Sequence, residues 1–180
     1  MATYTAEVVI GSDDGSDVST STDYIRAYYL DGFPTPTEEI GFAKITTSGV
    51  TGLGTITGAT LFWWNHSYTK SRSATYNREI LIWNGSSYSS IYTSTATPST
   101  LTWDSHALTS GELAYINNYN SNTQTLFRFE VGDPGGGYNR EWLTRAYEYG
   151  TDGTYNPYLE IYYTAATAPT QRRGRIFVIG

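Results

Sequence analysis

The chain has 180 residues, with 11 Lys and Arg, 17 Asp and Glu, no cysteine and a formal net charge of −6. At ~150 residues per domain this length predicts one domain, the lack of cysteine excludes disulfides and thiolate metal sites, and the acidic balance disfavours a nucleic-acid partner. Aromatic residues make up 16% of the chain, and together with many Gly, Ser and Thr they favour strands and turns, so we predict an all-β protein.

Short apolar alternations begin near the start of the chain. Residues 6–10 read AEVVI, with Ala6, Val8 and Ile10 on one side, and residues 24–30 read YIRAYYL. Alternation with a period of two is typical of strands that bury one face. By the same criterion, further strands are predicted at residues 40–46, 56–65, 78–83, 89–94, 99–103, 126–131, 140–150 and 157–163.

The alternation also predicts which side chains face the core. In residues 78–83, Ile80 and Ile82 face opposite to Leu81 and Trp83. About ten strands separated by turns predict a two-sheet, jelly-roll-like sandwich. The same core-facing parity is expected for Phe127, Phe129, Val131, Leu159, Ile161 and Tyr163.

One short helix is expected between two of these strands. Thr109 and Glu112 have the spacing of a capping box, and Leu113 and Ile116 supply a short apolar stripe. The polar residues 117–122, NNYNSN, end the helix. We therefore predict one connecting helix within the sandwich domain, residues 1–164.

Residues 165–180 form a C-terminal extended tail of different composition. The chain up to Tyr163 holds eight Lys and Arg against all 17 Asp and Glu, a net charge of −9, whereas the tail carries +3. Opposite charges favour docking of the tail on its own body or on a neighbouring copy, and its apolar segment has the character of an added edge strand. The predicted assembly residues are Arg172, Arg173, Arg175, Ile176, Phe177, Val178 and Ile179.

The sequence offers little for catalysis or metal binding. His66 and His106 lie forty residues apart with no ligand spacing around them, and no nucleophile elbow or phosphate loop occurs. We therefore expect no enzyme activity, no catalytic residue and no metal or cofactor. Asp13, Asp14 and Asp17 favour a solvated turn that does not match the EF-hand pattern, with Ca²⁺ as the alternative.

Adjacent tryptophans point to a surface role for aromatic rings. Trp63 and Trp64 must face opposite sides of a strand, so one is expected to fill the core. The other would join further rings in a platform for sugar rings or in a protein interface. The candidates for this surface aromatic platform are Trp63, Trp64, Trp103 and Trp142.

Three stretches of the chain resemble the DNRLRE-type extracellular sandwich domains. They are GVTGLGTITGATLFWW (49–64), WLTRAYEY (142–149) and NPYLEIYY (156–163). The resemblance implies a jelly-roll module related to carbohydrate-binding modules, of a kind that recurs in bacterial surface proteins and phage virions. It carries over no sugar-binding residue, because the matched positions are structural.

The opening of the chain suggests where such a module works. It has neither the basic region nor the 7–15-residue apolar region of a signal peptide, and no stretch reaches the length of a membrane helix. We expect a virion structural protein, made in the host cytoplasm and exposed after lysis: a phage capsid decoration protein whose partners are neighbouring copies or the major capsid protein. The alternatives are a lectin-like carbohydrate-binding module, with glycans as partners, and a self-assembling extracellular fibre joined by the tail strand.

Overall fold

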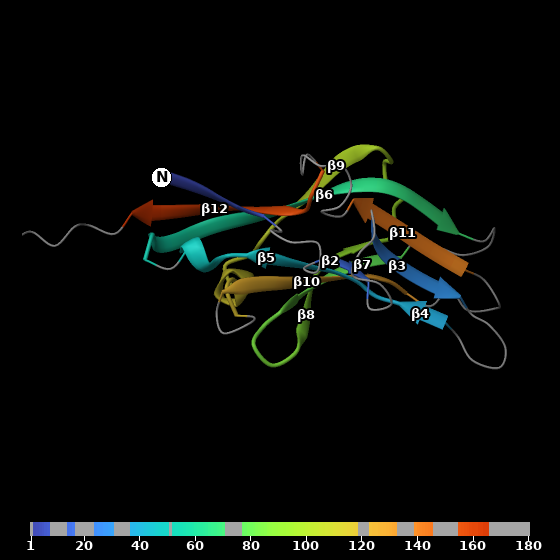
Figure 1. The fold of residues 1–180 in the computed structure, drawn as a ribbon, viewed down its shortest axis with the longest axis horizontal. Helices are drawn as coiled ribbons and strands as arrows, with labels where there is room; N and C mark the ends of the chain where they lie inside the picture. The colour runs from blue at the N-terminus through green and yellow to red at the C-terminus, as the bar shows by residue number, and fades with distance from the viewer. Residues whose placement is uncertain are drawn as a thin grey trace, which may run out of the picture.

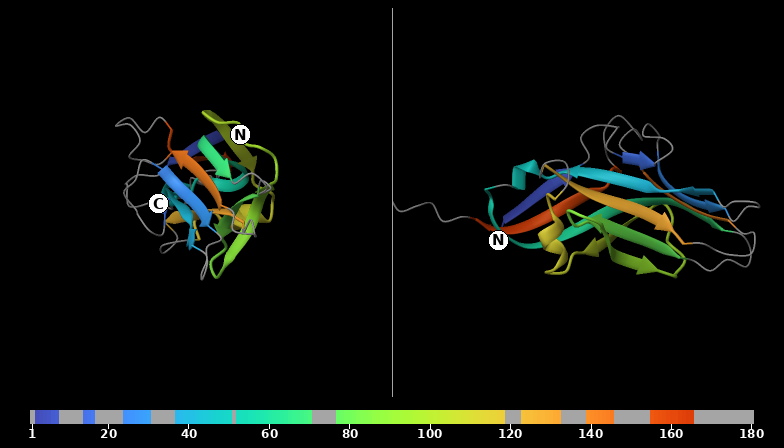
Figure 2. Two further views of the ribbon diagram at one scale, coloured as in Figure 1. Left: turned by 90° about the vertical axis from the view of Figure 1, so that its right-hand side faces the viewer. Right: turned by 90° about the horizontal axis from the view of Figure 1, so that it is seen from below.

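The protein is an all-β sandwich of two antiparallel sheets, as its composition predicts (Figure 1). The structure, a computed structural model, describes residues 2–7, 14–16, 24–30, 37–50, 52–70, 77–118, 123–132, 139–145 and 155–165. Seen end on, the strands of the two sheets curve around a common interior (Figure 2).

The larger sheet is organised around one long strand, β6 (Gly54–Lys70). Its first half pairs with β12, its second half with β11, and its middle residues with β9. Seven strands thereby share one continuous sheet, because β1 extends it beyond β12 while β3 and β4 extend it beyond β11. Their bounds are β1 (Ala2–Glu7), β3 (Tyr24–Leu30), β4 (Thr37–Glu39), β9 (Thr102–Ala107), β11 (Asn139–Arg145) and β12 (Tyr158–Ala165).

The smaller sheet has the order β2-β5-β10-β7-β8. The chain passes repeatedly from one sheet to the other, as in a jelly roll, so that β8 at one edge of this sheet is followed directly by β9 of the larger sheet. The bounds are β2 (Asp14–Ser16), β5 (Gly41–Thr46), β7 (Arg78–Trp83), β8 (Tyr88–Ser94) and β10 (Gln124–Val131), with 3-10 turns η2 (Ser48–Val50) and η3 (Glu112–Tyr115).

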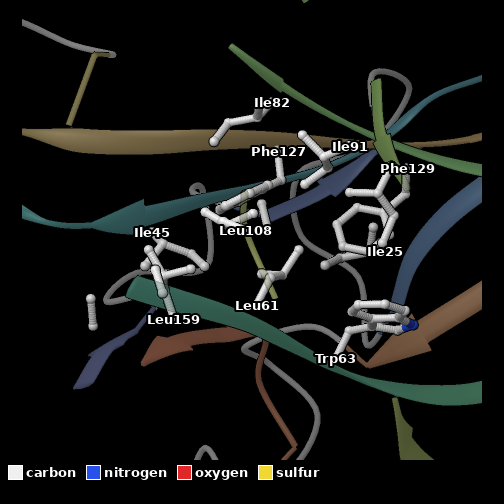
Figure 3. Close-up of a cluster of buried hydrophobic side chains, with 14 of the residues drawn as sticks. Ile25, Ile45, Leu61, Trp63, Ile82, Ile91, Leu108, Phe127, Phe129 and Leu159 are labelled. Carbon is white, nitrogen blue, oxygen red and sulfur yellow. The ribbon is translucent and has the colours of Figure 1, made fainter. Parts of the chain in front are cut away.

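The core lies between the sheets and follows the predicted alternation. Ile80 and Ile82 are fully buried, whereas their neighbours Leu81 and Trp83 are only partly buried. Each fully buried side chain of this size stabilises the fold by roughly 1.5–3 kcal/mol. Figure 3 shows Ile45, Leu61, Trp63, Phe127, Phe129 and Leu159 converging from both sheets.

The short connecting helix is present where it is expected, as the single 3-10 turn η3 and not as an α-helix. The capping contact is present, since the backbone N–H of Thr109 donates to Glu112 Oε2 at 2.7 Å. Asn117 then adopts a left-handed conformation with φ of 68°. Leu113, Tyr115 and Ile116 are the side chains that anchor this segment to the core, and a helix this short gains little from its own hydrogen bonds.

Some predictions fall on residues beyond the described ranges. Val8 and Ile10 of the first expected strand do so, and the tail does so from residue 166 onward. Strand β12 itself continues to Ala165. The predicted assembly residues Arg172, Arg173, Arg175, Ile176, Phe177, Val178 and Ile179 therefore stay a prediction.

Candidate functional site

A buried amide joins the two buried tryptophans of the larger sheet, Trp63 on β6 and Trp142 on β11. Asn65 is 1% exposed, and its Oδ1 accepts hydrogen bonds from the indole N–H of Trp63 at 3.1 Å and of Trp142 at 3.0 Å. An indole N–H can only donate a hydrogen bond. The Asn65 side chain must therefore turn its oxygen, and not its NH2 group, toward both rings. The Nδ2 group is thereby directed to Asp104, whose Oδ2 lies 3.4 Å away.

A β-bulge makes this geometry possible. In the pairing of β11 with β6, Leu143 lies opposite Ser67, but the next residue, Thr144, lies opposite Asn65. The register therefore shifts by one residue at this point. His66 is the extra residue, as expected for a bulge that places two residues opposite one. The bulge allows Asn65 and Trp142, which lie on different strands, to face the interior together.

Arg78 is a buried cation beside this amide. It is 2% exposed, and its guanidinium carbon lies 5.1 Å from the ring centre of Trp142 and 5.9 Å from that of Tyr92. Its Nη2 donates to the Tyr92 hydroxyl at 3.3 Å, while Nε and Nη1 have no hydrogen-bond partner. Within the described part of the chain no carboxylate forms an ion pair with Arg78. A buried charge without a counter-ion is costly, so this corner of the sandwich is destabilised as it stands.

A polar cleft of about 450 Å³ opens at this corner, between the sheet edges formed by β8 and β9. Its volume lies in the range of small-ligand pockets. The loop between the two strands borders it and is anchored by the N–H of Leu101, which donates to the Asn65 carbonyl at 2.8 Å. Leu101 is left-handed, with φ of 56°, and 62% exposed. The lining includes Asn65, Arg78, Tyr92, Thr102, Trp103 and Asp104.

The outer face of the larger sheet carries a second feature, which we name the outer aromatic cluster. Phe62 and Tyr158 stack with ring centres 4.7 Å apart at 8°, and Trp103 meets Tyr158 edge to face at 5.3 Å. Trp64 contacts Trp103 at 5.6 Å and Tyr155 at 4.5 Å. All five rings are only partly buried, so they present aromatic surface outside the core. Trp103 belongs to both this cluster and the cleft.

The structure separates the four tryptophans of the predicted aromatic platform into two pairs. Trp63 and Trp142 are 0% and 1% exposed, so their assignment to a surface platform is wrong: both pack in the core, where Asn65 satisfies their N–H groups. Trp64 and Trp103 do lie together on the outside.

The possible Ca²⁺ site is not described. Asp13 and Asp17 lie outside the described residues, and Asp14 begins β2 without a described side chain. Among the side chains that are described, no group of three metal-ligating residues occurs. No described helix has the length and apolarity to cross a membrane.

Asn65 and Arg78 were missed in the sequence, although their parity marks them. Arg78 has the same parity as Ile80 and Ile82, and Asn65 has the same parity as Trp63. A polar residue at an inward-facing position of an alternating strand is the sequence signal for a buried polar side chain. Such a side chain requires specific partners, which makes it a candidate for a functional role.

His66 occupies the opposite, outer face at the bulge. Its ring lies 4.8 Å from that of Tyr24, and Arg145 stacks on Tyr24 with its guanidinium carbon 4.8 Å from the ring centre. Burial, and secondarily the positive charge of Arg145, lower the pKa of His66 below 6.5.

Comparison with known families and proteins gives no identification: no family model matches the chain, and no curated protein matches it either. The resemblance to DNRLRE-type domains accordingly stays a prediction.

We expect Asn65→Ala to lower the free energy of unfolding by about 2–5 kcal/mol, because it leaves two buried indole N–H groups unpaired. Urea unfolding followed by tryptophan fluorescence measures this. The control is Asn118→Ala, which removes one exposed hydrogen bond to the Ala114 carbonyl and should cost about 1 kcal/mol or less. Similar costs for the two variants would contradict the role of Asn65.

We expect His66→Gln to reduce the loss of stability in mild acid. Because the native pKa lies below the unfolded value, the unfolded state binds more protons as pH falls through 6.5, and the wild-type protein loses stability until the native pKa is passed. Urea unfolding of both proteins at pH 7.5, 6.0 and 5.0 tests this. Parallel pH dependence in the two proteins would show that His66 does not contribute.

Proposed function

We propose that this chain is a non-enzymatic structural protein of a virion, most simply a phage capsid decoration protein that contacts neighbouring subunits. The observation that carries the proposal is the outer aromatic cluster. Contacting aromatic rings on the outside of a sheet are typical of the buried part of a protein interface, where Trp, Tyr and Phe are enriched.

The charge distribution supports assembly between copies. The body carries −9 and the tail +3, so a tail from one copy is attracted to the body of the next. The sandwich also reaches its buried core without any disulfide, which suits a subunit made in the reducing host cytoplasm and later exposed outside the cell.

We expect the full chain to form a small oligomer of defined mass in light scattering on a sizing column. Trp64→Ala should shift the mass toward the monomer, because it removes the ring that joins Trp103 and Tyr155. The matched control is Trp83→Ala, a partly buried tryptophan on the smaller sheet that contacts Tyr88, and it should leave the mass unchanged.

A chain ending at Ala165, which keeps all of β12, separates the tail from the aromatic cluster in the same experiment. If this shortened chain is a folded monomer, the tail is required for assembly in addition to the aromatic cluster. A full chain that stays monomeric at every concentration would contradict assembly between copies, and mass that grows without limit would favour a fibre.

A carbohydrate-binding module is the second candidate, favoured by the position of Trp103. This ring lies in the outer aromatic cluster and also lines the polar cleft, so ring surface and hydrogen-bonding groups meet in one place. Sugar-binding sites combine these two elements, since a pyranose has apolar ring faces and polar edges.

If this second function holds, a glycan array should give a binding oligosaccharide, and Trp103→Ala should weaken its affinity at least about tenfold in calorimetry. Trp83→Ala again serves as the control and should bind normally. An array without any binder at millimolar ligand would exclude this function.

A further inference from the structure

The cleft is flanked by two strands with an unpaired side. Among the described residues, β8 pairs only with β7, and β9 pairs only with β6. Tyr92 and Ser94 of β8 and Thr102 to Asp104 of β9 all line the cleft. A strand edge of this kind binds an extended backbone through main-chain hydrogen bonds, whatever the sequence of the partner.

The positive charge of Arg78 in the cleft indicates that an extended segment bound there would carry a negatively charged side chain. Arg78 lines the cleft with two guanidinium nitrogens unpartnered and no ion pair to any described carboxylate. An anion placed there replaces the missing counter-ion, and a charge-assisted hydrogen bond in such a site is stronger than a neutral one.

We infer that the cleft binds an extended segment of a partner protein, which adds to the open strand edges and places an Asp or Glu carboxylate against Arg78. This inference deepens the proposed function by naming one contact with its protein partner. Its test uses neither the tail nor the oligomer mass, so its failure and that of the proposed function are distinguishable.

Asp104 limits the type of anion. Its carboxylate lines the same cleft, with Oδ1 accepting from the Ser105 N–H at 2.9 Å and Oδ2 facing Asn65. Asp104 opposes any anion in the cleft, and it repels a phosphate with nearly two charges more strongly than a carboxylate with one. Leu101 is exposed in a left-handed conformation between Thr100 and Thr102, which line the cleft, so its side chain is available for an apolar contact with the segment.

The test uses the full chain labelled with ¹⁵N and two capped pentapeptides, Ac-Thr-Val-Glu-Val-Thr-NH2 and its neutral Gln counterpart. In ¹H–¹⁵N NMR titrations we expect the Glu peptide to shift the backbone signals of β8 and β9 and the Nε–H signal of Arg78 saturably. Its affinity should exceed that of the Gln peptide at least about tenfold.

Variants assign the preference to the cleft. Arg78→Met should make the two peptides equal, whereas Arg128→Met, which removes an arginine on β10 that pairs with Glu130, should keep the preference. If Arg78→Met does not fold, Asp104→Asn decides the question: it removes the competing carboxylate and should tighten binding of the Glu peptide.

Three results would overturn the inference. Equal affinity for the two peptides in the unchanged protein would remove the role of Arg78, and shifts confined to residues outside β8, β9 and their loop would place the contact elsewhere. Displacement of the Glu peptide by glucose or inorganic phosphate more effectively than by acetate would make the cleft a sugar or phosphate site.

Discussion

The structure depends on one buried carboxamide oxygen shared by two tryptophans. Each indole N–H would cost roughly 1–3 kcal/mol if it were left unpaired, and Asn65 Oδ1 satisfies both. The same residue reaches Asp104 of β9 through its amide nitrogen and holds Leu101 through its carbonyl. Strands β6, β9 and β11 and the loop beside the cleft therefore meet at Asn65, and their positions are coupled.

This polar centre lies beside the open strand edges of β8 and β9. Apolar side chains such as Phe127 and Leu61 fill the middle of the space between the sheets, whereas Asn65 and Arg78 occupy inward positions beside the cleft. The guanidinium of Arg78 lies on the ring of Trp142, which provides a cation–π contact and no counter-ion. Stability lost at this edge is what a ligand can recover, since binding to the native state adds to its stability by mass action.

Alternation in the sequence predicts the strands well, because it reflects burial on one face. Residues 24–30 form a strand with the predicted bounds, and Trp63 and Trp64 face opposite sides. What it does not predict depends on contacts between distant segments. The hydrogen bond from Trp142 to Asn65 follows from the bulge at His66, which brings the two side chains to one face, and the cleft follows from β8 and β9 ending in different sheets. No local pattern encodes that register.

The outer aromatic cluster and the cleft are best understood as one continuous surface. Trp103 lines the cleft while its ring contacts Trp64 and Tyr158 on the outer face. A segment seated along β9 would bury the exposed part of Trp103 and so extend onto the cluster. Aromatic rings then supply contact area at low entropic cost, and Arg78 supplies selectivity by charge. Because Asn65 fixes β9 and the adjoining loop, this surface is preorganised, which lowers the cost of binding.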